Sequence, residues 1–349
     1  MPRRRIQPQA LLGVTGSVSH RRLPLDARCP LAKSGLVSDR HGGILDGSAP
    51  PGAGIYGLDD SVERAGVVLV PVPWEATTSY GRGTAAAPSA IARASVQVDL
   101  FDVELGEPAR AGIAMLPEDA ELRDRSTRAS EAALRVIAAF DAGANGSEAD
   151  LAVVDELSRW RDAWLRREVG RWLDEGKLVG VIGGDHSVAF GSIAAHAARS
   201  RDLGLLHIDA HADLRVAYQG FVASHASVMH RVLDEIDGVS KLVSGGLRDL
   251  CAEEHQAIRR QADRVVAFFD ADLARQVLAG ASFASLCRQI VEPLPETVYV
   301  SFDIDGLDPA LCPHSGTPVV GGLSFHQAMA MLGALVESGR RVVGFDLCE

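Results

Sequence analysis

The sequence has few cysteines, and none of them has a spacing that indicates a structural role. Its five cysteines lie far apart along the 349 residues, and no two of them form a Cys-x-x-Cys pair. An odd number of cysteines without such spacing argues against both a disulfide framework and a zinc ribbon. We therefore expect a reduced, cytoplasmic protein.

Long apolar runs and an excess of positive charge are also lacking. No apolar run approaches the roughly 18 residues of a transmembrane helix. The formal net charge of −11 at pH 7 argues against nucleic acid or an anionic membrane as the main partner. Residues 1–25 carry five arginines and no acid, but their apolar stretch is too short and too interrupted for a signal peptide. The acidic remainder suits a cationic substrate or a bound metal ion.

The chain divides into two parts of different composition. Residues 1–55 are rich in Gly, Pro, Arg and Ser without a sustained period, which predicts a disordered leader. Residues 56–349 are expected to form a single α/β domain, truncated at its carboxyl end because the chain stops just after the last expected strand. The expected strands are 66–72, 178–182, 203–208, 241–244, 265–269, 297–302 and 341–345. The expected helices are 87–98, 128–141, 152–175, 187–200, 225–235, 252–262, 282–291 and 324–338.

Polar clusters follow three of the expected strands. They are GGDHS at 183–187, DAHADL at 209–214 and SFDIDGLDP at 301–309. Because ligands collect at the carboxyl ends of strands in open parallel sheets, we expect the three clusters to meet at one edge. The side chains predicted to bind metal there are His186, Asp209, His211, Asp213, Asp303 and Asp305.

The composition of this set decides which metal it suits. Four carboxylates on one edge repel each other unless positive charge offsets them, and two divalent ions would do so. The set contains no thiolate, so it favours hard ions such as Mn²⁺. A capped turn or a satisfied polar pair is the alternative for any single motif, but three clusters at three strand ends favour metal. His207 lies one pleat earlier, and we expect it to be hydrogen-bonded in the core or to orient a ligand.

These motifs, with GTPVVGGL at 316–323, resemble those of the ureohydrolases, the family of arginase, agmatinase and their relatives. The resemblance covers roughly residues 65–349. It implies an arginase-like three-layer α/β/α sandwich with a mainly parallel sheet of about eight strands. It also implies two Mn²⁺ per chain, a homo-oligomer (a trimer or a hexamer), and a small cationic guanidino substrate that is hydrolysed to urea and an amine.

The resemblance also implies roles for individual residues. Asp213 would orient the attacking water in addition to binding metal. His225 matches the family's proton-shuttling histidine, with a surface position as the alternative. Glu349 matches a glutamate that pairs with the substrate guanidinium, with a solvated position as the alternative. By resemblance the metal ligands form three pairs: His186 and Asp213 on one ion, His211 and Asp305 on the other, and Asp209 and Asp303 bridging both.

The region expected to hold the far end of the substrate departs from the arginase pattern. The loop 215–223, RVAYQGFVA, lacks the expected Asn and Ser, and Cys251 stands where an aspartate is expected. Agmatine is therefore the first expected substrate. We expect Glu254 on the substrate side and Arg248 in an ion pair with Asp249.

Several alternatives remain open from the sequence. Within the family they are arginase, guanidinobutyrase and formimidoylglutamase activity. An inactive metal-binding fragment is a further alternative. A zinc deacetylase is disfavoured, since a single catalytic zinc typically keeps only three protein ligands.

Overall fold

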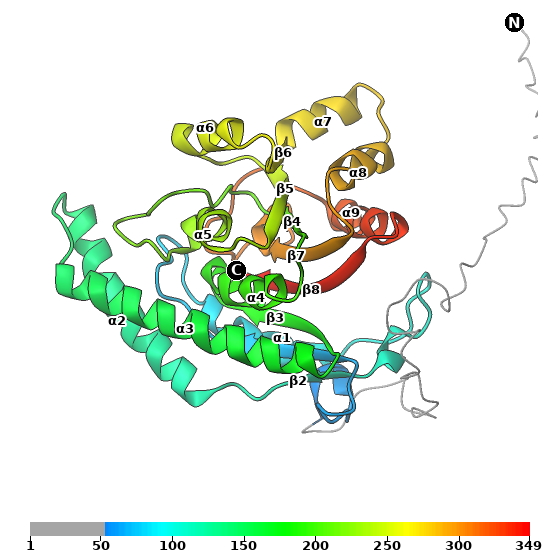
Figure 1. Cartoon of the computed structure of the whole chain (residues 1–349), viewed down its shortest axis with the longest axis horizontal. Helices are drawn as coiled ribbons and strands as arrows, with labels where there is room; N and C mark the ends of the chain where they lie inside the picture. Colours follow the sequence, from blue (N-terminus) through cyan, green and yellow to red (C-terminus); the bar gives the residue numbers. More distant parts are fainter. Residues whose placement is uncertain (1–52) are drawn as a thin grey trace, which may run out of the picture.

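The structure is a computed structural model and describes residues 53–349. The predicted leader lies outside this range except for its last three residues. Eight parallel strands form one sheet in the order β2-β1-β3-β8-β7-β4-β5-β6, with helices on both faces (Figure 1). No helix among the described residues is long and apolar enough to cross a membrane. The fold is the three-layer α/β/α sandwich with a parallel sheet of eight strands that the sequence predicts.

The strands and helices have the following bounds. The strands are β1 (Val67–Val72), β2 (Ile113–Met115), β3 (Leu178–Gly183), β4 (Leu203–Ile208), β5 (Val239–Leu247), β6 (Val265–Phe269), β7 (Thr297–Asp303) and β8 (Arg341–Cys348). The α-helices are α1 (Ala87–Ser95), α2 (Ala120–Asp141), α3 (Glu148–Asp174), α4 (Ala189–Ala197), α5 (Val228–Glu235), α6 (Ala252–Arg260), α7 (Asp270–Leu278), α8 (Phe283–Val291) and α9 (Phe325–Glu337).

All seven strands predicted from apolar runs are present, and two elements were not predicted. β2 is an edge strand of three residues, too short for its alternation to stand out. Helix α7 begins at the residue after β6, so no Gly- or Pro-rich turn marks the boundary between them. Helix α3 begins just after Ser147, the first residue of a Ser-x-x-Asp capping pattern. The Ser147 side chain accepts a hydrogen bond from the Asp150 backbone N–H.

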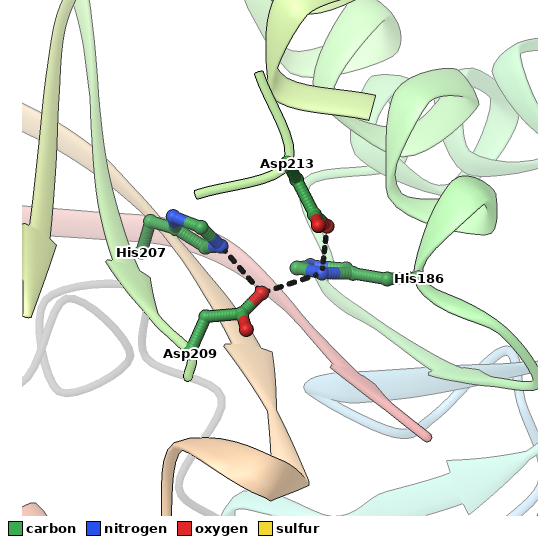
Figure 2. A group of neighbouring side chains, drawn as sticks. All are labelled: His186, His207, Asp209 and Asp213. Carbon is green, nitrogen blue, oxygen red and sulfur yellow. Dashed lines mark hydrogen bonds and ion pairs between the residues drawn. The ribbon is translucent and has the colours of Figure 1, made fainter. Parts of the chain in front are cut away.

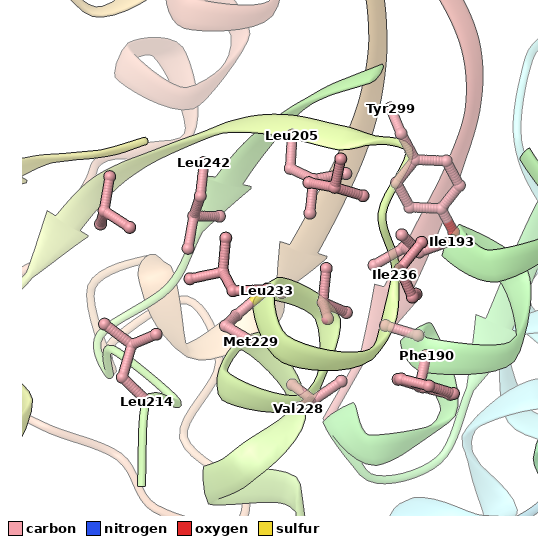
Figure 3. Close-up of a cluster of buried hydrophobic side chains, with 14 of the residues drawn as sticks. Phe190, Ile193, Leu205, Leu214, Val228, Met229, Leu233, Ile236, Leu242 and Tyr299 are labelled. Atoms are coloured by element: carbon pink, nitrogen blue, oxygen red, sulfur yellow. The ribbon is translucent and has the colours of Figure 1, made fainter. Parts of the chain in front are cut away.

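The core consists of apolar layers on both faces of the sheet. On one face, α4 and α5 cover apolar side chains of β4, β5 and β7, among them Leu205, Leu242 and Tyr299 (Figure 3). On the other face, α8 and α9 cover Leu206, Ile208 and further side chains of the same strands. Since successive side chains of a strand point to opposite faces, each central strand is apolar on both.

The α4–α5 face changes character towards the carboxyl ends of the strands. Along β4, Leu203 and Leu205 belong to the apolar cluster, whereas His207 and then Asp209 follow on the same side. All four residues are buried. The sheet therefore carries its apolar core up to a polar edge, and that edge holds the predicted site.

Candidate metal centre

Three loops at the carboxyl edge of the sheet bring the predicted ligands together. His186 opens a short 3₁₀ turn after β3. Asp209, His211 and Asp213 follow β4, which lies next to β7. Asp303 ends β7, and Asp305 lies in the 3₁₀ turn after it.

Two glycines in the motifs allow these loops to approach one another. A Cβ atom on Gly184 would lie 1.7 Å from the carbonyl oxygen of Trp74, and one on Gly306 would lie 2.8 Å from the backbone nitrogen of Asp209. Both distances are too short for a side chain, so the glycines of GGDHS and SFDIDGLDP are required by packing. Trp74 itself is fully buried, so its side chain packs in the core.

The first group of ligands surrounds the imidazole of His186 (Figure 2). Its Nδ1 lies 3.0 Å from Asp213 Oδ2, 3.1 Å from Asp209 Oδ2 and 3.4 Å from Asp303 Oδ2. All four side chains are buried. None of these contacts has the geometry of a hydrogen bond, and the buried Nδ1 is left without a hydrogen-bond partner.

The second group lies around His211 and shares Asp209 with the first. His211 Nδ1 lies 3.1 Å from Asp305 Oδ2 and 3.4 Å from Asp209 Oδ1. Asp209 thus faces His186 with one carboxylate oxygen and His211 with the other. The His211 side chain is 23% exposed, so this end of the cluster is the one open to solvent.

The electrostatics of the cluster call for added positive charge. Burial raises the pKa of Asp303 well above its usual value, and the charges of Asp305 and Asp209 raise it further. Burial by itself would lower the pKa of His211, but hydrogen bonding to Asp209 and Asp305 raises it to about 11. The carboxylates therefore need protons or cations beside them.

The side chains present fit divalent metal ions. Ligand atoms of His186, His207, Asp209 and Asp213 lie within 4.8 Å of one another, and so do those of Asp209, His211 and Asp305. A buried imidazole nitrogen without a hydrogen-bond partner, facing three carboxylate oxygens, is an arrangement that a cation would satisfy.

His207 lies beside His186, Asp209 and Asp213 but differs from His186, because both of its ring nitrogens already have partners. Nδ1 lies 3.0 Å from Ser244 Oγ and Nε2 lies 2.8 Å from Asp209 Oδ2. It is fully buried. This is the hydrogen-bonded core position expected from the sequence, and from it His207 holds Asp209 in place.

His225 lies close to the cluster on the 3₁₀ turn before α5. Its Nδ1 lies 3.3 Å from Thr77 Oγ1, which also accepts a hydrogen bond of 3.2 Å from the His225 backbone N–H. The edge of the Tyr218 ring packs against the imidazole, with 5.9 Å between ring centroids. Burial lowers the pKa of His225, so the ring is held neutral near pH 7. It is half-buried, not freely exposed.

The Glu349 side chain turns into the cluster. Its Oε1 accepts a hydrogen bond of 3.1 Å from the His186 backbone N–H, and its Oε2 is buried without a partner. Burial, followed by the charge of Asp185, raises the pKa of this carboxyl well above its usual value. The solvated position considered from the sequence is therefore wrong.

Arg215 and Glu254, which follow His211 in the chain, bind other groups of the protein. The Arg215 guanidinium lies 3.6 Å from Glu254 Oε2 and over the ring of Tyr218, 5.1 Å from its centroid. Glu254 is buried and accepts hydrogen bonds from the backbone N–H groups of Leu214 and Cys251. The prediction that Glu254 would face the substrate is not supported by these contacts.

The expected ion pair between Arg248 and Asp249 is wrong. The guanidinium of Arg248 donates to backbone carbonyl groups, including those of Val319 and Asp305, at 2.6–3.2 Å. Asp249 instead points outward at the rim, 65% exposed and 3.9 Å from His211 Nε2. The carbonyl group of Val319, in the loop 316–323, is among those that bind the guanidinium, so the guanidinium does not pair with Asp249.

Sequence reasoning assigned no role to several side chains that touch the site residues, and four of them lie beside His225 and His186. They are Thr77 and Tyr218 beside His225, and Ser301 and Asp346 beneath His186. Thr77 lies in a loop whose polar residues give no periodic signal. Asp346 lies just beyond the predicted end of its strand, where the apolar run stops.

Comparison with known proteins gives one consistent result. The sequence matches the arginase family over residues 65–349. The N(1)-aminopropylagmatine ureohydrolase of Thermus thermophilus is 34% identical over 297 residues, which cover 84% of this chain and 86% of the relative. The agmatinase of Bacillus anthracis is 28% identical and covers 83% and 84%. The crystal structure of agmatine ureohydrolase of Thermoplasma volcanium superimposes with a TM-score of 0.64 and 26% identity over 83% of each chain.

Proposed function

Because the chain belongs to the arginase family, we propose that it hydrolyses the guanidino C–N bond of agmatine or a related guanidino amine. The products are urea and the free amine. One observation supports the proposal above all. Two imidazoles and four carboxylates lie together at one edge of the sheet, and Asp209 contacts both His186 and His211. This donor set suits a pair of divalent cations, and its His211 end is partly open to solvent.

The proposed cofactor is two Mn²⁺ per chain. His186 and Asp213 would hold one ion, and His211 and Asp305 the other, with Asp209 and Asp303 reaching both. The set has oxygen and imidazole ligands and no thiolate, which favours Mn²⁺ over softer metals. When bound, such ions would lower the pKa of water and so supply a nucleophile near neutral pH.

Glu349 is proposed to position the substrate. The guanidinium carbon is stabilised by delocalisation and is a poor electrophile, so it must be held in an attack geometry. The partnerless Oε2 of Glu349 is a carboxylate oxygen available to a guanidinium N–H donor. Asp213, whose Oδ2 faces His186, would accept a hydrogen bond from the attacking water and orient it.

His225 is proposed to deliver the proton to the leaving amine. Water adds to the planar carbon, the C–N bond to the chain-bearing nitrogen breaks, and that nitrogen must gain a proton to leave as an amine. A neutral imidazole can take the proton released by water and pass it on. Thr77 and the Tyr218 ring hold the His225 imidazole for this transfer.

The substrate preference follows from the groups that are already engaged. Arg215 is bound to Glu254 and Tyr218, so it is not free to meet an α-carboxylate. Cys251 begins helix α6 and brings no carboxylate for an α-ammonium group. Losing charge-assisted hydrogen bonds of this kind costs about 1.5–3 kcal/mol each, so arginine should be disfavoured by roughly a hundredfold or more.

A longer guanidino amine is the second candidate. The relatives that are 33–34% identical over 84% of this chain are N(1)-aminopropylagmatine ureohydrolases. The outward carboxylate of Asp249, 3.9 Å from His211, offers an acceptor for an additional ammonium group. This candidate uses the same reaction and differs only at the far end of the substrate.

The test is urea release by the full-length protein with Mn²⁺, on agmatine, N(1)-aminopropylagmatine, arginine and guanidinobutyrate in parallel. We expect one of the two amines to have the highest kcat/KM and arginine to trail it by about a hundredfold. Arginine or guanidinobutyrate ahead by tenfold would overturn the substrate assignment. Absence of urea from all four, in protein that binds Mn²⁺, would overturn the reaction itself.

A further inference from the structure

A row of buried polar side chains crosses the sheet directly beneath the candidate metal centre. Backbone pairing places Ser244 of β5 opposite His207 of β4, His207 opposite Ser301 of β7, and Ser301 opposite Asp346 of β8. Two residues earlier in β5, β4 and β7, on the same face, lie Leu242, Leu205 and Tyr299, which belong to the apolar core. The row thus separates the apolar core from the ligand carboxylates.

Two members of this row, Ser301 and Asp346, are connected to His186. The Ser301 hydroxyl donates a hydrogen bond of 3.0 Å to Asp346 Oδ1, and the same oxygen, Ser301 Oγ, lies 2.9 Å from His186 Nε2. Asp346 is 0% exposed, and its Oδ1 also lies 3.8 Å from His186 Nε2. The chain of contacts therefore runs from a buried carboxylate through a hydroxyl to the imidazole.

The direction of these hydrogen bonds fixes the tautomer of His186. An ionised carboxylate only accepts, so Ser301 must use its single O–H group on Asp346. The Ser301 oxygen is then left as an acceptor, which places a hydrogen of the imidazole on Nε2, so that the neutral ring has its lone pair on Nδ1. Nδ1 is the buried nitrogen that faces Asp209, Asp213 and Asp303.

Packing does not account for the carboxylate of Asp346. Its Oδ2 is buried without a hydrogen-bond partner, and a buried carboxylate with an unpaired oxygen is an unfavourable way to fill a core position. Its neighbours in the strand, Phe345 and Leu347, show that apolar residues fill the other face. The position therefore carries a carboxyl group where an apolar side chain would avoid the cost of burying a polar one.

We infer that Ser301 and Asp346 are positioning residues that orient His186 as a metal ligand and so set the affinity of one of the two proposed ions. The inference rests on the proposed metal-dependent function and deepens it. His211 has no link to Ser301 or Asp346 among the contacts of the described residues, so an ion at His211 and Asp305 would not depend on them directly.

The test is a titration of Mn²⁺ alone into full-length protein that has been stripped of metal, with free Mn²⁺ measured by electron paramagnetic resonance. For Ser301→Ala we expect one class of site to weaken by about 10–100-fold and the other to keep its affinity. Ser301→Cys keeps a weak donor at similar size, and an intermediate affinity at the same site is expected. Circular dichroism of both variants reports whether the fold is intact.

Ser192→Ala is the matched control. Ser192 is also a fully buried serine, and its Oγ accepts a 2.9 Å hydrogen bond from the Tyr299 hydroxyl without contacting His186. It should leave both affinities unchanged. Equal weakening in Ser192→Ala and Ser301→Ala, or unchanged affinities in folded Ser301→Ala and Ser301→Cys, would overturn the positioning role. A wild-type protein that binds no Mn²⁺ would instead overturn the metal-dependent function beneath it.

Discussion

Two histidines ten residues apart are almost equally buried but lie in opposite electrostatic surroundings. His186, 1% exposed, is at the carboxyl edge of the sheet, with three carboxylate oxygens within 3.4 Å of its Nδ1. His196, 2% exposed, lies in α4 in the interior, where it meets the carbonyl group of Ser192 and the ring of Tyr299. Burial lowers the pKa of His196 to about 4, whereas the carboxylates raise the pKa of His186 well above its usual value despite its burial.

The difference separates two kinds of region. At the edge, burial is combined with charges that only a proton or a cation can balance, so the arrangement favours binding over stability. In the interior, burial is combined with uncharged partners, so the imidazole stays neutral. Substitutions at the edge should therefore change metal content and rate, and substitutions in the interior should change only the free energy of unfolding.

The largest effect is expected from Asp209→Ala. Asp209 faces His186 with one oxygen and His211 with the other, so its loss should release both ions and abolish urea release. Metal content by elemental analysis after dialysis measures this. Asp249→Ala is the control, because Asp249 is an acid at the rim that lies 3.9 Å from His211 and should leave both ions bound. Two ions retained in Asp209→Ala would contradict the sharing of this carboxylate.

His225→Ala should separate rate from metal binding. We expect both ions to remain and kcat to fall roughly 10²–10⁴-fold, the usual contribution of a positioned acid–base group. His230→Ala, five residues further on in α5, is the control and should keep wild-type kcat. A His225→Ala rate equal to wild type between pH 6 and 10 would mean that another group delivers the proton.

A smaller effect is expected from Thr77→Val. The hydroxyl lies 3.3 Å from His225 Nδ1 and accepts a hydrogen bond from the His225 backbone N–H, and valine keeps the shape of the buried side chain while removing both contacts. One hydrogen bond contributes about 1 kcal/mol, so the loss of two should lower kcat by roughly 5–30-fold with both ions in place. Thr78→Val is the matched control, because Thr78 Oγ1 donates to Glu75 instead. An equal fall in both variants would indicate a loosened loop, not a lost contact to His225.

The sequence allowed the edge to be predicted better than the interior network. His186, Asp209, His211, Asp303 and Asp305 follow their strands directly, so local spacing was enough to place them together. Asp213 was expected to share a face with Asp209 by strand alternation, but β4 ends at Ile208. Asp213 reaches His186 because its backbone adopts a left-handed conformation, with φ of 53°. No alternation pattern encodes that turn.

Contacts between strands were the part that the sequence could not provide. The last strand was predicted to end at Phe345, where the apolar run stops, but pairing with β7 carries it to Cys348. The position of Asp346 opposite Ser301 depends on that pairing and on the order of strands in the sheet. Neither is local, so neither appears in a single-sequence pattern.

The smallest effect on activity, and the sharpest test of the interior, is expected from His196→Gln. The unfolded state binds a proton on this imidazole below about pH 6.5, whereas the folded state does so only near pH 4. The free energy of unfolding of the wild type should therefore fall as pH is lowered from 6.5 towards 4. The difference between the two pKa values corresponds to about 3 kcal/mol.

Glutamine does not titrate and can still donate to the Ser192 carbonyl group, so the His196→Gln variant should lose less stability over the same range of pH. Urea denaturation of both proteins at several pH values measures the two slopes, and subtracting one from the other removes the titration of the edge carboxylates that they share. Urea release at pH 7 should be unchanged, because the hydrogen bond and the ring contact that His196 makes within residues 53–349 are to Ser192 and Tyr299 and not to the site residues. Parallel slopes would show that His196 is already charged, or exposed to solvent, in the folded protein, and the contrast with His186 would then not hold.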